Sequence, residues 1–239
     1  MSLSLRNIRL VVMGSWSLFL IWLWQSGNVL RYLGPHTVWV VSFGAIALSL
    51  STLAYAWFSR DGREAAVGVG WGRAAGMAAL LLPIAIGVTL ANASLGALAA
   101  SNKLSARGVD MAELARTLAS GSKAVSFLQI EGAGSDPSLS GELGLREGTN
   151  VSLTGLVMKA SAAAGDRFEL GRFYITCCVA DALPVSVEVD PALIGGGPYP
   201  EDKWLKVKGT LVRADQGFTV EATVIDAIEE PDDPYLSFR

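Results

Sequence analysis

Hydrophobic and polar residues follow two different patterns along the chain, one in each half. Residues 10–30, 37–58 and 77–100 are long apolar stretches without a single Asp, Glu, Lys or Arg. A helix rises about 1.5 Å per residue, so about 20 residues cross the ~30 Å hydrocarbon core of a bilayer. A charged residue at the bilayer centre costs roughly 2.5–3.5 kcal/mol on insertion scales, so its absence from all three stretches is informative. The pattern therefore predicts a transmembrane region over residues 1–103 with three α-helices.

The third of these helices differs from the others in composition. It is rich in Gly, Ala and Ser at three- and four-residue spacing, and Pro83 lies in its first third. Small residues let another helix approach closely, and proline permits a kink. The helix could therefore dock on a partner membrane protein, or it could pack against the first two helices of the same chain.

The distribution of arginine predicts the orientation of the helices. Positive residues precede the first helix and lie between the second and the third (Arg6, Arg9, Arg60, Arg63 and Arg73). Because positively charged loops stay in the cytoplasm, the N-terminus is expected there and the part after residue 103 is expected outside. A cleavable signal peptide is the alternative for the first helix, but its three tryptophans and its lack of a small-residue cleavage pattern favour an uncleaved helix.

The second half begins with a segment of mixed composition. Residues 104–149 are expected to form a linker with one short helix over about 109–120, which Asp110 and Glu113 would cap. Residues 131–149 contain five glycines and no apolar period, which predicts a loop.

A mostly β domain is predicted over residues 150–239. Apolar and polar residues alternate there with a period of two, and glycine-containing turns separate the runs. Gly155 and Gly209 interrupt strands, as β-bulges do where a small sheet curls closed. We therefore expect a small barrel of the oligonucleotide/oligosaccharide-binding (OB) type, with a β-sandwich as the alternative. The expected strands cover residues 150–159, 167–178, 185–189, 204–212 and 218–228, and an extended, exposed tail follows over 229–235.

Charge also separates the two halves. Residues 1–103 carry a net charge of +5 and residues 104–239 carry −8, which together give the −3 of the chain. The acidic half would repel phosphate, and the chain has no basic patch suited to nucleic acid. Nucleic acid is therefore excluded as a partner, and the lipid bilayer is the expected environment of the first half.

The only two cysteines, Cys177 and Cys178, are adjacent and are the main candidates for chemistry. On a continuous strand they would point to opposite faces and could not share a metal ion. If the strand ends before them, Cys177, Cys178 and Asp181 could converge on a soft transition metal such as zinc, with a fourth ligand from water or a partner. The alternatives are one cysteine in the core with the other at a strand end, or a disulfide between the two neighbours. Arg172 and Asp181 could also form a salt bridge, either structural or part of the site.

Catalytic chemistry is not expected. The only histidine, His36, lies in the first half, and the β domain has neither a nucleophile elbow nor a phosphate-binding loop. Glu188 and Asp190 are carboxylates at short spacing that would line a solvated edge. The chain is therefore predicted not to be an enzyme.

Three motifs in the second half carry a family resemblance: RFYITCCVADALP at 172–184, WLKVKGTL at 204–211 and EPDDPYL at 230–236. Together with the apolar stretches and the run SARG at 105–108, they cover nearly the whole chain. In these segments the sequence resembles the YcgQ-type family of bacterial membrane proteins, which are described as permease subunits. Members are commonly encoded beside a larger multi-spanning permease, and some such permeases handle metal or metalloid ions. The resemblance thus implies a permease partner in the bacterial cell membrane and adds weight to the adjacent cysteines as functional residues.

The leading functional hypothesis is a non-catalytic accessory subunit of a membrane permease. Its helices would dock on the permease, and its β domain would lie over the outer mouth, where it could touch a thiophilic ion. The alternative is an extracytoplasmic metal-binding or thiol redox module that acts without a permease. A barrel that binds cell-envelope saccharides is a third reading.

Overall fold

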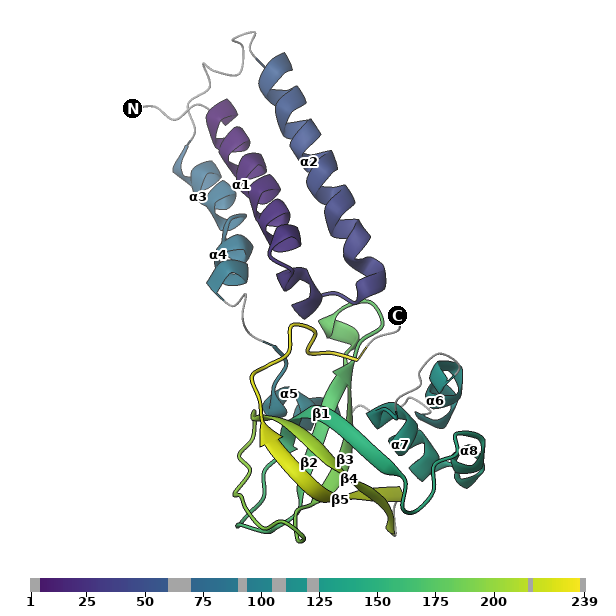
Figure 1. Cartoon of the computed structure of the whole chain (residues 1–239). Helices are drawn as coiled ribbons and strands as arrows, with labels where there is room; N and C mark the ends of the chain where they lie inside the picture. Colours follow the sequence, from purple (N-terminus) through teal and green to yellow (C-terminus); the bar gives the residue numbers. More distant parts are fainter. Residues whose placement is uncertain are drawn as a thin grey trace. The chain divides into compact units, whose positions relative to one another are not determined.

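The computed structural model describes residues 5–59, 70–89, 94–104, 111–119, 125–214 and 217–236. The chain forms two compact units, Met1–Ala93 and Ser94–Arg239 (Figure 1). Arg60, Arg63 and Asp110, as well as the SARG run, lie outside the described residues.

Two long helices dominate the first unit. Helix α1 covers Leu5–Gln25 and helix α2 covers Val38–Phe58, and the two pack side by side in opposite directions (Figure 1). The uncharged runs of the sequence make up most of these helices, although α1 also includes Arg6 and Arg9. The chain turns between the helices at Gly27, which has a positive φ of 73°. Two of the three predicted apolar helices are therefore confirmed.

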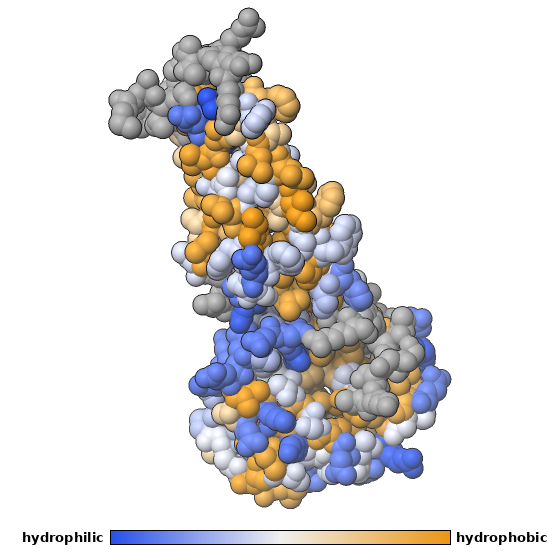
Figure 2. Space-filling view, turned by 45° about the horizontal axis from the view of Figure 1, so that its top comes forward, coloured by the Kyte–Doolittle hydropathy of each residue, from blue (hydrophilic) through white to orange (hydrophobic). Residues whose placement is uncertain are grey.

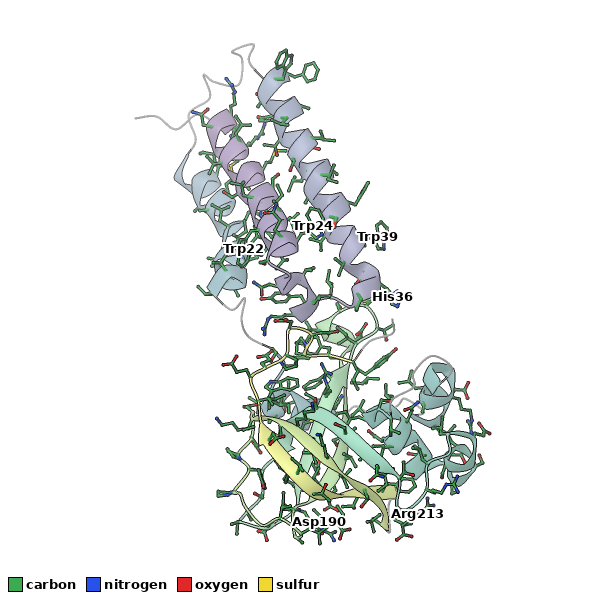
Figure 3. The ribbon with its side chains drawn as sticks, in the orientation of Figure 1. Trp22, Trp24, His36, Trp39, Asp190 and Arg213 are labelled. Atoms are coloured by element: carbon green, nitrogen blue, oxygen red, sulfur yellow. The ribbon has the colours of Figure 1, made fainter. Side chains whose placement is uncertain are left out.

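Both helices are long and apolar enough to cross a membrane. Only 11% of the most apolar window of α1 and 6% of that of α2 are buried, so neither is enclosed as a core helix of a soluble protein would be. Figure 2 shows apolar side chains covering much of the visible surface of these helices. Trp22 and Trp24 of α1 lie at the same end of the pair as Trp39 of α2, which is 67% exposed (Figure 3). Tryptophans at helix ends are typical of a membrane interface.

The prediction of one continuous helix over residues 77–100 is wrong. The structure has two shorter helices, α3 (Trp71–Ala79) and α4 (Leu82–Thr89), with a turn at Leu80 and Leu81. Pro83 has no N–H to donate to the carbonyl four residues before it, and its ring crowds that carbonyl, so the helix breaks there.

The broken helix packs against α1 of the same chain. The indole Nε1 of Trp16 donates to the carbonyl of Leu80 in the break, at 3.0 Å. A Cβ on Gly87 would lie 2.8 Å from the ring of Phe19, so the absence of a side chain at Gly87 makes room for this ring. The small residues of this segment therefore serve packing within the chain at this position.

The second unit contains a closed barrel of five strands in the order β1-β2-β3-β5-β4 (Figure 1). The pairing of β3 with β5 is parallel and the other pairings are antiparallel. The closed barrel is confirmed, and the β-sandwich alternative is wrong. The strands are β1 (Asn150–Lys159), β2 (Phe168–Tyr174), β3 (Leu183–Asp190), β4 (Trp204–Ala214) and β5 (Gly217–Ala227).

The period of two places alternate side chains inside the barrel, where they form its core. The pairing of β4 with β5 shifts register at Lys208 and Gly209, so the bulge expected at Gly209 is confirmed. The bulge expected at Gly155 is wrong, because β1 shifts register against β2 between Val157 and Lys159 instead. Gly155 permits a close approach: a Cβ there would lie 2.7 Å from the carbonyl oxygen of Gly171 and 2.9 Å from the ring of Phe127. The large, fully buried side chains of this core include Val157, Phe168, Leu170, Val185, Val189, Val207, Leu211 and Val220.

The described residues between 104 and 149 are helical to a large extent and do not form the linker predicted above. They include α6 (Met111–Ala119), α7 (Phe127–Ser135) and α8 (Pro137–Glu142). The second unit already begins at Ser94, and α5 (Ala97–Leu104) contacts β1 and β3. Helix α7 packs on β3 and β5, and Phe127, Leu128 and Ile130 of α7 belong to the barrel core.

Local signals explain why α7 and α8 form where a loop was predicted. Ser126 and Gln129 make a capping box at the start of α7. Asp136 accepts the N–H of Ser138 at 2.9 Å and so caps α8, whose first residue is a proline.

The C-terminal tail is not exposed along its whole length, as the sequence suggested. Tyr235 is only 3% exposed, and Leu236 pairs with Tyr174 beside β2. The N–H of Leu236 donates to the carbonyl of Phe173 at 2.8 Å, and the N–H of Ile175 donates to the carbonyl of Leu236 at 3.0 Å. The buried ring of Tyr235 and two backbone hydrogen bonds of Leu236 therefore hold the end of the tail on the barrel.

Candidate metal site

The two cysteines lie in a loop at one end of the barrel. Strand β2 ends at Tyr174 and β3 begins at Leu183, so Cys177 and Cys178 follow the strand rather than continue it. Cys177 is exposed, Cys178 is partly buried, and the two are not joined in a disulfide. The strand end therefore removes the geometric objection to a shared ion.

Asp181 organises this loop. Its carboxylate accepts the backbone N–H groups of Thr176 at 3.1 Å and Cys177 at 2.8 Å, with a longer contact to that of Cys178 at 3.4 Å. A short 3-10 helix, Val179–Asp181, completes the turn, and its last N–H donates to the carbonyl of Cys178 at 3.0 Å. The spacing Cys-Cys-x-x-Asp therefore brings the carboxylate back onto the two cysteines.

The three predicted ligands converge. One ligand atom from each of Cys177, Cys178 and Asp181 lies within 4.8 Å of the other two. Zinc–sulfur bonds of ~2.3 Å in a tetrahedral site place sulfur atoms about 3.8 Å apart, so a small rearrangement of the loop would complete such a site. Three protein ligands also leave one position open for water or for a ligand from another protein.

The charges around the loop favour a bound cation. A hydrogen bond from the thiol to Asp181, another interaction with the neighbouring Cys178 and partial desolvation raise the pKa of the Cys177 thiol to about 11. Burial opposes the ionisation of Asp181, but the N–H donors of Cys177 and Thr176 outweigh it, and the pKa of this carboxyl is lowered. The carboxylate is thus ionised at neutral pH, and a divalent cation would compensate the charges of two thiolates beside it.

The raised pKa predicts slow alkylation of Cys177. At pH 8 only roughly one thiol in a thousand would be ionised, so the rate of reaction with iodoacetamide should still rise as the pH approaches 11. Asp181→Asn should lower the pKa of the thiol and speed alkylation at pH 8 by roughly tenfold, because the gain in thiolate exceeds its loss of nucleophilicity. Fragment mass spectrometry resolves the two cysteines. Asp226→Asn, at an exposed position on β5, is the control, and equal rates in both variants would refute the role given to Asp181.

Arg172 has other partners than the predicted Asp181. Its guanidinium donates to the backbone carbonyls of Asp233 and Pro234 in the tail, with a distance of 3.1 Å to that of Pro234. The guanidinium carbon also lies 5.7 Å from the centre of the Trp204 ring. Burial lowers the pKa of this arginine, while Asp233 raises it. The role of Arg172 is therefore to hold the tail against β2.

A groove at the opposite end of the barrel has a volume of about 730 Å³ and lies between α7, β3 and β5. Its charged side chains have partners within the protein. Arg167 pairs with Glu188 at 3.2 Å and with Asp190 at 2.9 Å, and Glu131 accepts the N–H of Ser186 at 3.3 Å. Figure 3 marks Asp190 and Arg213 near this end. The carboxylates of β3 therefore line a salt-bridged edge, and the cysteine loop is the better candidate for a binding site.

The barrel and its cysteine loop lie in the part of the chain that matches a family model. Residues 142–237 match the model of the DUF1980 C-terminal domain. The DUF1980 match includes all five strands, the cysteine loop and the docked tail, and it leaves out α5 and α7. A search of curated proteins and a search of solved structures returned no match. The finer resemblance to YcgQ-type permease subunits stays a prediction.

Proposed function

We propose that the protein is a non-catalytic, membrane-anchored subunit whose barrel binds a thiophilic cation through Cys177, Cys178 and Asp181. The observation that carries this proposal is the convergence of three ligand atoms within 4.8 Å of one another. Soft thiolate ligands select ions such as zinc, and an open fourth position suits an ion that is taken up and passed on rather than held permanently.

The helical unit would anchor the barrel. Helices α1 and α2 are long enough, apolar enough and sufficiently exposed to lie in a bilayer. With a cytoplasmic N-terminus, a third crossing by α3 and α4 would place the barrel on the extracytoplasmic side. The sequence resemblance supports a multi-spanning permease as the membrane partner, and the cation would be its cargo or its regulator. The alternative role, a metal-binding or thiol redox module without a permease, uses the same loop.

Metal titration of the full-length protein in mild detergent tests the site. Addition of Zn²⁺ or Cd²⁺ under reducing conditions should show one bound ion per chain, with thiolate-to-metal absorption in the case of Cd²⁺. Cys177→Ser and Cys178→Ser should each weaken binding at least about 100-fold, because each removes a direct ligand. Asp181→Asn should weaken it as well, and Asp226→Asn, a matched loss of one exposed carboxylate, should leave it unchanged.

Two results would count against the proposal. Stoichiometric binding that survives both cysteine substitutions would place the ion elsewhere, and no binding by the reduced wild-type protein would refute a metal site. Co-purification from native membranes addresses the partner separately: recovery of a metal-binding chain without any multi-spanning protein would favour the module that acts alone.

A further inference from the structure

The cysteine loop shares a hydrophobic cluster with the segment that follows the helical unit in the chain. Ala100 of α5 and Ile175 and Ala182, which flank the loop, are buried together in this cluster. Val179, between the cysteines and Asp181, packs against the same cluster, as does Leu95. The cluster is completed by Met158, Phe173, Tyr235 and Ala99.

Hydrogen bonds attach the same segment at its first residues. The hydroxyl oxygen of Tyr235 accepts the N–H of Leu95 at 3.1 Å, and the Asp202 carboxylate accepts the N–H of Ala97 at 2.7 Å. Tyr235 therefore joins three parts of the barrel unit: its ring packs with the residues around the loop, its backbone lies in the docked tail, and its hydroxyl meets the chain that enters from the helical unit.

We propose that occupation of the cysteine loop is coupled to the docking of residues 95–104 on the barrel, with Tyr235 as the residue that transmits the coupling. This inference rests on the proposed cation site. It adds a function to that site, because ion binding would change the docking of residues 95–104, which follow α4 in the chain; α4 ends at Thr89.

The geometry gives the coupling a physical cause. An ion would hold the ligand atoms of Cys177, Cys178 and Asp181, which lie within 4.8 Å of one another, at the fixed distances of a coordination sphere, and any adjustment to those distances moves the Val179–Asp181 turn between them. Val179 and Ala182 pack against the cluster that contains α5, so a shift of the turn changes the packing of α5. Packed interfaces have discrete arrangements rather than continuous ones, and a small displacement can therefore select between a tightly and a loosely docked α5.

Because binding and docking are linked, the coupling can be measured as an effect of the ion on docking and as an effect of docking on the affinity for the ion. If an ion strengthens the docking of α5 by some factor, then docking strengthens the binding of the ion by the same factor, and a variant that weakens docking lowers the affinity for the ion. Tyr235→Phe removes the hydroxyl that accepts from Leu95 and keeps the ring in the cluster. Asp202→Gly removes the acceptor for Ala97 without strain, since Asp202 has a positive φ of 63°.

The experiment uses the full-length protein in detergent with Cd²⁺ as the probe. In the wild type, Cd²⁺ should slow hydrogen exchange in the peptide 95–102. Tyr235→Phe and Asp202→Gly should each weaken Cd²⁺ binding by up to roughly fivefold, the largest effect that the loss of one docking hydrogen bond can pass to the ion. Tyr199→Phe, a partly buried tyrosine elsewhere in the barrel unit, should bind Cd²⁺ as the wild type does.

The outcomes separate this inference from the proposed site. Two outcomes would overturn the coupling alone. Cd²⁺ could bind normally but leave the exchange in 95–102 unchanged, or both docking variants could bind Cd²⁺ within twofold of the wild-type affinity. Failure of the wild type to bind Cd²⁺ would overturn the site and the coupling together. A merely structural Tyr235 would alter the exchange of 95–102 equally with and without Cd²⁺, and that result would also refute the coupling.

Discussion

Phe127→Ala is expected to lower the free energy of unfolding of the barrel by about 3–5 kcal/mol, the usual range for deletion of a large buried ring. Phe127 is 2% exposed, belongs to the barrel core and touches the position of Gly155 on β1. Hydrogen exchange of the slowest amides in β2 and β4 measures the change within the barrel, independently of the helical unit.

Leu193→Ala is the control for this prediction. Leu193 is 62% exposed, and its truncation should change the free energy of unfolding by less than about 0.5 kcal/mol. If Phe127→Ala had an equally small effect, α7 would be a detachable part of a linker rather than a layer of the barrel core.

Gly209→Ala is expected to lower the free energy of unfolding of the barrel by about 2–4 kcal/mol. A Cβ at Gly209 would lie 2.2 Å from the carbonyl oxygen of Glu221 and 3.0 Å from the Cα of Ala222. These are backbone atoms of the paired strand, which cannot turn aside as a flexible side chain would, so the two strands must separate at the bulge. The loss should appear as faster exchange along β4 and β5.

Gly141→Ala is the matched control because it adds the same methyl group where there is space. No atom lies within 4 Å of the position of its Cβ, and Gly141 is in α8. Alanine should be neutral there or stabilise the helix by about 0.5–1 kcal/mol. Similar losses in both variants would show that the crowding at the β4–β5 bulge has no energetic consequence.

The barrel could be predicted from the sequence because half-buried strands leave a period of two. The five strands start and end within a few residues of the expected positions, except where Cys177 and Cys178 were placed on an extended β2. Helix α7 was missed because Gly132 and Gly134 count against a helix. A Cβ at Gly134 would lie 2.9 Å from the Cα of Gly217, so this glycine permits a close approach to β5. Such a contact joins residues far apart in the chain and leaves no local pattern, although the capping box at the start of α7 was a readable signal.

The residues of the candidate site could be predicted from the sequence, but the contacts that surround the site could be predicted only in part. Cys177, Cys178 and Asp181 stood out by type and spacing, and their convergence depended only on where β2 ends. The partner of Arg172 could not be found in this way, because it bonds to the backbone carbonyls of Asp233 and Pro234. A carbonyl is present at every residue, so the sequence does not mark the ones that a buried guanidinium will reach.

Closure of the barrel restricts how another protein can bind it. Each of the five strands has a neighbour on both sides, and β3 pairs with β5 over only three residues from Glu188 to Asp190. Just before that short pairing, the N–H of Ser186 is taken by Glu131 of α7. Many proteins recruit partners by adding a strand to an open sheet edge. A protein that recognises this barrel must therefore read its side chains and loops, and the specificity of that encounter will depend on surface residues rather than on the main chain.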